Sequence, residues 1–126
     1  MIIFNDFEKW CRRAIGKGIP DNVVALVFNI YEGEDNRWSV EVVGTSSFDE
    51  HYDDWACDEV TTFDTRDNPF SWQEEAPWEN VLSEVRGLVK CYIESETSLD
   101  KLKEMRGIAC GFVDGDLELI YKNSAE

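Results

Sequence analysis

The nine residues VVALVFNIY, at positions 23–31, constrain the fold of this chain more than any other segment. β-Branched and aromatic side chains fill the run, which is typical of a β-strand with little exposure to solvent. A strand this apolar indicates a central place in a sheet, because strands with one solvated face alternate apolar and polar residues. The fold is therefore expected to be built around a sheet that buries this segment.

Further strands are predicted on both sides of the chain's middle. After a polar turn at 33–36, RWSVEVVG (37–44) alternates apolar and polar residues and predicts an antiparallel hairpin with one buried face. Its turn is slightly longer than the tightest types. CDEVTTF (57–63) predicts a third strand. GIACGFV and DLELIYK, separated by Asp114-Gly115, predict a second hairpin, since Asp-Gly between apolar runs favours a tight turn.

An amphipathic helix is predicted near the N-terminus, over IFNDFEKWCRRAIGKG (3–18). Asn5 or Asp6 is suited to cap its start, and Gly16 or Gly18 to end it. Its apolar residues recur every three or four positions and share one face: Phe4, Phe7, Trp10, Cys11, Ala14 and Ile15.

The clearest helix in the sequence begins at Pro77, which suits the first helical position. Gly87 weakens its middle by about 1 kcal/mol relative to alanine, so a close packing contact is expected there. The stripe that defines this helix consists of Trp78, Val81, Leu82, Val85, Leu88, Val89, Tyr92 and Ile93.

The remaining segments complete one α+β domain over residues 1–126. FSWQEEA (70–76) reads as a loop between Pro69 and Pro77, and SLDKLKEM (98–105) as a short helix. We expect an antiparallel sheet of about five strands, formed by two hairpins and the third strand. This sheet is packed against the N-terminal and the central helix.

Composition and charge limit the kind of partner. The net charge of −15 disfavours binding to nucleic acid phosphates and to anionic lipids, and favours a basic protein, although acidity also serves solubility alone. No apolar run approaches the roughly 20 residues of a membrane span, and the start MIIFNDFEKW lacks signal-peptide character. The expected location is cytoplasmic, with the four cysteines reduced and partly buried.

Patterns for catalysis, metals and cofactors have little support. His51 is the single histidine and lies among carboxylates, which favour its protonated form and make it a poor base. Asp53-Asp54 and Asp58-Glu59 could supply two acids, but neighbours on a strand point to opposite faces. No zinc spacing, calcium loop, P-loop or dinucleotide fingerprint is present. The expectation is a non-catalytic protein without metal or cofactor.

The acidic residues concentrate in one segment that is also aromatic. Residues 44–79 hold eleven Asp or Glu and one Arg, a balance of −10, and three of the five tryptophans. Solvated acidic tails are poor in aromatics, so this segment is expected to fold onto the domain with its carboxylates outward. Trp78 is expected in the core. Trp55 and Phe63 either seal the sheet edge or join a partner-binding face.

Three elements resemble small bacterial immunity proteins of polymorphic-toxin and contact-dependent inhibition systems. They are DDWACDEV (53–60), the helix start PWE (77–79) and GFVDGDLEL (111–119). The resemblance implies an inhibitor that binds a cognate toxin, often a basic nuclease, at or beside its active site. It carries no contact residue over, because immunity families use different surfaces.

The candidate partner-binding residues follow from charge and aromaticity in the acidic segment. Carboxylate contacts are paired with aromatic anchors in one set: Asp49, Glu50, Tyr52, Asp53, Asp54, Trp55, Asp58, Glu59 and Trp72. Two alternatives stay open. One is a small hydrolase with an unrecognised carboxylate site, which requires a pocket around two convergent acids. The other is an acidic adaptor whose partner is another protein.

Overall fold

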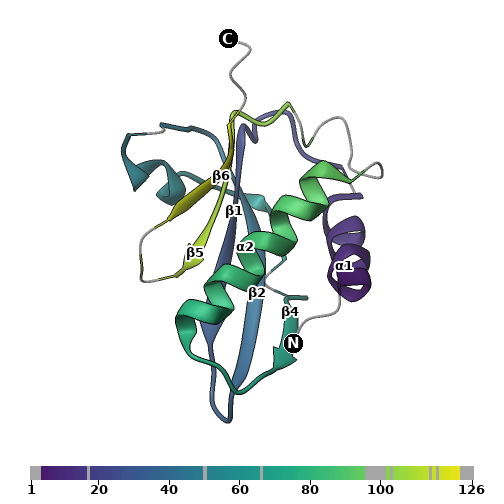
Figure 1. Ribbon diagram of the computed structural model, residues 1–126. Coiled ribbons are helices and arrows are strands. Elements are labelled where there is room, and N and C mark those ends of the chain that lie inside the picture. Colours follow the sequence, from purple (N-terminus) through teal and green to yellow (C-terminus); the bar gives the residue numbers. More distant parts are fainter. Residues whose placement is uncertain are drawn as a thin grey trace.

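The apolar run at 23–31 forms β1, Ala25–Glu32, and β1 lies inside the sheet with a strand on each side (Figure 1). The computed structural model describes residues 4–16, 18–49, 51–65, 67–95, 102, 104–113, 115 and 117–122, without the side chains of residues 53, 61, 62 and 64. The predicted central strand is confirmed, and so is the α+β class.

Pairs of consecutive strands follow each helical element along the chain. In order they are α1 (Phe4–Gly16), β1 (Ala25–Glu32), β2 (Arg37–Thr45), the 3₁₀-helix η1 (Asp53–Cys57), β3 (Glu59–Asp64), β4 (Phe70–Gln73), α2 (Trp78–Glu94), β5 (Gly107–Phe112) and β6 (Glu118–Lys122).

The sheet is mixed rather than wholly antiparallel. Its strand order is β3-β2-β1-β5-β6, and β4 also pairs with β2. Both predicted hairpins, β1–β2 and β5–β6, are present, but β1 and β5 run parallel. The expectation of an antiparallel sheet is therefore wrong at one pair. The reason is topological: the chain reaches β5 only after crossing the sheet through α2, which allows parallel pairing.

The β1–β2 turn is tighter than its length in the sequence indicates. Asp35 and Asn36 both have positive φ, at 56° and 61°, and the Arg37 amide donates to the Glu34 carbonyl at 3.1 Å. Two consecutive left-handed residues closed by such a bond are the signature of a type I′ turn. Asn and Asp tolerate this conformation better than other non-glycine residues.

The segment expected as a loop between Pro69 and Pro77 contains strand β4. β4 pairs antiparallel with the first half of β2, while β3 pairs with its second half. Side chains along β4 alternate between half-buried and exposed, as a strand at the surface of a sheet requires. Four residues are too short a pattern to show this alternation in the sequence.

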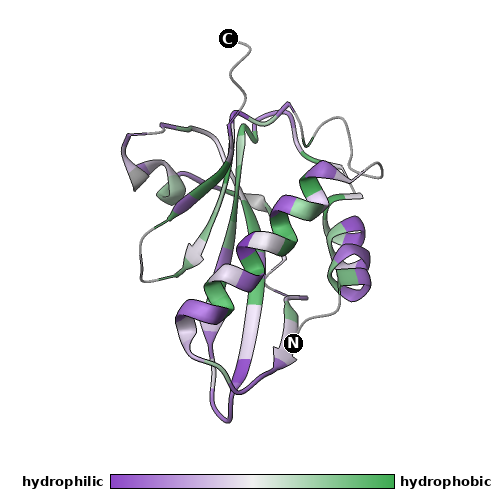
Figure 2. Ribbon diagram, in the orientation of Figure 1, coloured by the Kyte–Doolittle hydropathy of each residue, from purple (hydrophilic) through white to green (hydrophobic). Residues whose placement is uncertain are grey.

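Both helices cover the same face of the sheet (Figures 1 and 2). In Figure 2 their outward surfaces are largely hydrophilic, and apolar residues line the strands beneath. The predicted apolar stripes are confirmed as the contact surfaces. The buried helical residues are Phe7, Trp10, Cys11, Ile15, Val81, Val85, Val89, Tyr92 and Ile93.

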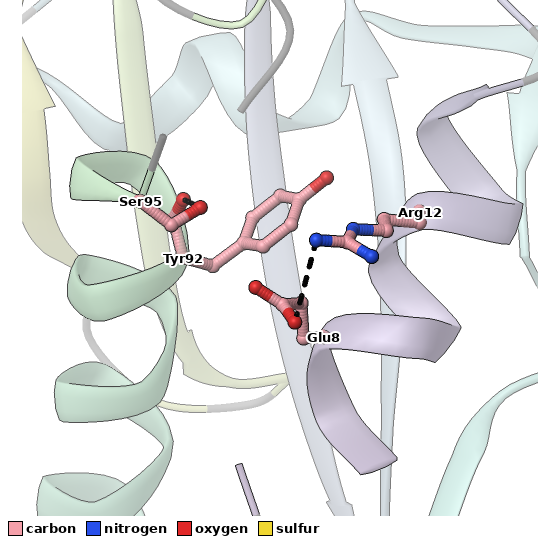
Figure 3. A network of polar contacts seen from close by, with 4 residues as sticks. All are labelled: Glu8, Arg12, Tyr92 and Ser95. Carbon is pink, nitrogen blue, oxygen red and sulfur yellow. Dashed lines mark hydrogen bonds and ion pairs between the residues drawn. The ribbon is translucent and has the colours of Figure 1, made fainter. Parts of the chain in front are cut away.

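Tyr92 joins the two helices. Its ring is buried and its hydroxyl points toward Arg12 of α1, whose guanidinium lies 3.5 Å from the Glu8 carboxylate (Figure 3). At the end of α2, the Ser95 hydroxyl donates to the Tyr92 carbonyl at 2.9 Å. Burial raises the pKa of Tyr92 to about 12, and burial with the nearby Glu8 raises the pKa of the Cys11 thiol.

Several local predictions about the helices are wrong. α1 begins at Phe4, so Asn5 and Asp6 lie inside its first turn and do not cap it. Pro77 is the N-cap residue with extended backbone, not the first helical residue. Gly87 is exposed, and a Cβ there would meet no atom within 4 Å, so the expected close contact is absent.

Trp78 is not a core residue. It is 53% exposed at the start of α2, where its ring makes an edge-to-face contact with Phe112 of β5 at a centroid distance of 5.9 Å. Its position on the stripe predicted burial, but burial along α2 begins only at Val81, three residues later. The predicted helix at 98–105 lies mostly outside the described residues. Within it, Leu102 and Met105 are buried.

Candidate functional site

Residues 46–58, here called the acidic lid, pack on part of the face of the sheet opposite the helices. Phe48 and Trp55 face this side with ring centroids 5.0 Å apart and planes at 65°. Trp55 is 5% exposed and packs in a second, small core with residues of β1, β2 and β5. The lid is therefore held by its aromatic side chains, which leaves its polar residues on the outside.

A glycine in β5 makes room for the lid. A Cβ on Gly107 would lie 2.1 Å from Cε1 of Phe48, a separation that no pair of unbonded atoms tolerates. The Phe48 ring thus rests directly on the backbone of β5. Gly107 is the residue that allows the lid to sit this close to the sheet.

Hydrogen bonds fasten the two ends of the lid to each other. The Ser46 amide donates to the Asp58 carbonyl at 2.9 Å, and the Ser47 hydroxyl donates to Oδ2 of Asp58 at 2.6 Å. Within the lid, the His51 amide donates to Oδ1 of Asp49 at 2.8 Å. These contacts fix the backbone of a loop that would otherwise be free to move.

The outer surface of the lid joins one large aromatic ring to several carboxylates. Tyr52 is 69% exposed, the highest value among the exposed large hydrophobic residues of the described chain. Asp49, Asp54 and Asp58 are exposed beside it in sequence, and Glu59 is half-buried at the start of β3. The lid contains no lysine or arginine.

Not all of the predicted contact residues meet on this surface. Glu50 lies outside the described residues, and the side chain of Asp53 is not described. Trp55 was expected as an exposed anchor or as an edge seal. Its burial beneath the lid removes its ring from the surface and makes it the lid's own support.

Trp72 is far from the lid. It lies in β4 opposite Trp38, whereas the lid leaves β2 at Thr45, opposite Glu59. Seven residues of strand separate the two positions, about 23 Å at roughly 3.3 Å per residue. Trp72 also packs against the helix-side core, so it does not belong to the lid's surface.

Trp72 instead belongs to a small polar cluster at the other end of the sheet. Its indole donates to Oε1 of Glu74 at 3.1 Å, and the Trp38 indole donates to the Glu74 carbonyl at 2.9 Å. Partial burial acts to raise the pKa of Glu74, but hydrogen bonds with Glu84 and Trp72 outweigh it, and the pKa is lowered.

A buried carboxylate on the lid side was missed in the sequence. Glu41 is 2% exposed and accepts a hydrogen bond from the Tyr31 hydroxyl. In the sequence Glu41 alternates with Trp38, Val40 and Val42, which places it on the opposite face of β2, and such a face is expected to be solvated. Only the folded sheet, where Tyr31 stands on the neighbouring strand, shows that this position is buried.

Two general features bear on the chemistry. Among the described residues, no group of three or more His, Cys, Asp or Glu is arranged to hold a metal ion. In the same part of the chain, no helix is both long and apolar enough to cross a membrane. Cys11 and Cys110 are buried, while Cys57 and Cys91 are exposed, so the expectation of partial burial holds for two of the four thiols.

Comparisons with protein-family models, with curated proteins and with solved structures gave no match to this chain.

Proposed function

We propose that this protein is a non-catalytic inhibitor of immunity type, which binds a basic, nuclease-like toxin domain through the outer surface of the acidic lid. The observation that carries the proposal is Tyr52, a ring 69% exposed among the carboxylates of the lid. Tyrosine is enriched among residues that dominate binding energy, because it buries a large area with little loss of side-chain freedom.

The construction of the lid supports a binding role. Its backbone is held by Phe48 and Trp55 below and by Asp58 at its ends, so its outer groups are presented in a fixed arrangement. A preorganised surface loses less entropy on binding than a mobile loop.

The charge distribution supports a basic partner. The two helices carry five acidic and five basic side chains, whereas the charged side chains of the lid are five carboxylates with no lysine or arginine. A field of one sign on one surface speeds encounter with an oppositely charged protein and selects against others.

The first experiment is affinity capture from the native cell at low and at moderate salt. The expected result is a basic protein in stoichiometric amount, lost as salt rises. The captured protein should be toxic when it is expressed alone and harmless when it is expressed with this chain. A non-toxic partner would favour the adaptor alternative, and no partner at either salt would favour the carboxylate enzyme.

The purified complex then tests the lid. Tyr52→Ala should weaken binding by about 2 kcal/mol, roughly thirtyfold in Kd. Trp78→Ala, at an exposed aromatic residue of α2 on the helix-covered side, is the control and should leave Kd unchanged. Equal effects of the two variants would contradict the proposal.

The charge of the lid is tested separately. Asp49→Asn, Asp54→Asn and Asp58→Asn together should slow association and reduce its salt dependence, because they remove the steering field. The control changes the same charge elsewhere, with Glu32, Glu34 and Glu94 replaced by glutamine; all three are exposed. If the control slows association as much, net charge and not the lid attracts the partner.

A further inference from the structure

The margin of the acidic lid runs between two residues that face each other across the last strand pair of the sheet. Ala109 of β5 and Leu119 of β6 are directly paired. Ala109 is 1% exposed in the lid-side core that contains Trp55, whereas Leu119 is 42% exposed. Directly paired residues hold their Cβ atoms about 5 Å apart on one face of a sheet. Leu119 is therefore the first side chain of this row that lies outside the lid.

The residues around Leu119 confirm that it lies on the lid side. Leu117, two residues earlier, is half-buried and packs against the same lid-side core, so β6 begins beside the lid (Figure 1). Ile120, the next residue, packs against the helix-side core. Side chains alternate between the two faces of a strand, so Leu117 and Leu119 share the face that carries the lid. We refer to these two leucines as the apolar margin.

The composition of β6 is unusual for its place in the sheet. Among the described strands it is the last in the sheet order, which makes it an edge strand. Edge strands commonly carry charged side chains, which discourage association with other chains. β6 has charged residues only at its ends, Glu118 and Lys122, and its three apolar central residues are not buried.

A single exposed apolar residue is ordinary on a protein surface. Here, however, an apolar edge adjoins a loop that holds five carboxylates and the exposed ring of Tyr52. Protein-binding surfaces typically combine an apolar part, which is emptied of water on binding, with a charged part around it. The lid and the apolar margin together have this composition.

We propose that the apolar margin receives an apolar side chain of the basic protein that binds the lid. The inference rests on the proposed function, because the margin and the lid form one continuous surface. Charge selects the occupant: a second copy of this chain would bring another net charge of −15 and another acidic lid to the contact, and like charges oppose that. A basic partner is attracted by the lid while it covers the leucines.

The two parts of this surface act at different stages of binding. The carboxylates attract a basic protein over roughly 8–10 Å at ordinary salt, so they raise the association rate. An apolar contact acts only when water has been excluded from it, so it slows dissociation and is insensitive to salt. The partner expected from this surface presents an apolar residue with lysines or arginines around it.

The purified complex tests this division through its rate constants. Leu119→Ala should weaken binding by about fivefold to tenfold through faster dissociation, with an unchanged association rate. The triple lid variant, with Asp49→Asn, Asp54→Asn and Asp58→Asn, should instead slow association. Leu82→Ala, at a half-buried leucine of α2, is the matched control on the helix-covered face and should leave both rates unchanged.

Surface plasmon resonance at two salt concentrations measures these rates. An unchanged dissociation rate in Leu119→Ala, or a change no larger than that in Leu82→Ala, overturns the inference. If the triple lid variant still slows association in that case, the proposed function stands without the apolar margin. If neither the lid variant nor Leu119→Ala alters the rates, the partner binds elsewhere, and the role of the lid fails as well.

Photo-crosslinking keeps the test decisive if Leu119→Ala disturbs the fold. p-Benzoylphenylalanine in place of Leu119 in the full chain, irradiated in the native cell, should crosslink to the same basic protein that affinity capture identifies. The same probe in place of Tyr52 should also crosslink to it, and in place of Trp78 on α2 should not. Crosslinking from the Tyr52 position alone overturns only the inference. A crosslink from the Leu119 position to a second copy of this chain overturns it in favour of self-association, and no crosslink from either position contradicts the proposed lid surface too.

Discussion

The two faces of the sheet are made from the same strands but are closed in different ways. On one face, α1 and α2 bury a large continuous core. On the other, the acidic lid buries a small core with two aromatic rings, Phe48 and Trp55, and leaves the rest of the face open. Neighbouring residues of β2 show the contrast: Val42 packs under the helices and Val43 under the lid.

The helix-covered face thus supplies most of the core, and the lid-covered face displays charged and aromatic side chains to solvent. The residues that a helix buries recur with the helical period, so the same geometry also fixes which residues lie on its outer face. A short lid needs only a few inward rings, so most of its residues are free to carry charge outward. The lid can therefore hold carboxylates and Tyr52 on its surface without loss to the main core.

The largest expected effect is a loss of folding stability at alkaline pH, caused by groups buried under the helices. Burial raises the pKa of Tyr92 and of Cys110 to about 12, and raises that of Cys11. Each of these groups has a higher pKa in the folded than in the unfolded protein, so its neutral form favours the folded state. The full stabilisation is present below pH 9 and is lost as pH rises toward 12. Each group should contribute a slope of about 1.4 kcal/mol per pH unit within its own interval.

Denaturant unfolding under reducing conditions from pH 8 upward measures this decline. Cys110→Ala should flatten the curve, whereas Cys57→Ala, at an exposed thiol, should not. If unfolding free energy falls with pH equally in the two variants, the buried groups of the helix-side core do not cause the alkaline unfolding.

The next effect compares the faces directly through two adjacent valines. Val42→Ala should cost about 2–3 kcal/mol of unfolding free energy, because α1 and α2 cannot collapse into the cavity. Val43→Ala should cost only about 1 kcal/mol, because the lid can settle onto the sheet. Chemical denaturation of both variants measures the difference, and equal costs would mean that the lid is as rigid as the helices.

A smaller effect is expected where the lid meets β5. Gly107→Ala places a methyl group against the Phe48 ring and should cost about 1–2 kcal/mol as the lid lifts. Hydrogen exchange should locate the change in residues 46–58 and leave α2 protected. Faster exchange throughout the protein would show that the lid is part of the main cooperative unit.

The smallest effect is a gain on the outer surface of α2. Gly87→Ala should stabilise the protein by about 1 kcal/mol, since the position is open and alanine is the better helix former. The same glycine-to-alanine change thus has opposite signs at 87 and 107. Denaturation midpoints compare them, and a loss at 87 would reveal a packing role that the exposed position does not explain.

Regular elements with long patterns were predictable. The stripes of α1 and α2, the central strand β1 and both hairpins follow from residue spacing, and all are present. β4 was not predicted because its four residues are too few to show an alternating pattern. Trp78 was misjudged because periodicity gives the side of a helix but not the position at which burial begins. Gly87 was misjudged because the low helix propensity of glycine was taken as a sign of close packing, whereas the position is open.

The candidate site was predictable only in part. Charge and aromatic content directed attention to residues 48–59, and Tyr52 with Asp49, Asp54 and Asp58 is exposed there. The inclusion of Trp72 assumed that nearness in sequence means nearness in space, and β2 separates the two places by seven residues. Glu41 gave no signal, because its burial comes from Tyr31 on another strand.

The sequence by itself determined the two long helices and both hairpins, that one segment concentrates acid, and that β1 is central. These are properties of contiguous residues, which periodicity and composition measure directly. Only the tertiary structure decided that β5 pairs parallel to β1, that Trp55 faces inward while Tyr52 faces outward, and that Gly107 makes room for Phe48. Those outcomes depend on which distant segments meet, because a side chain's environment is set by the surface packed against it.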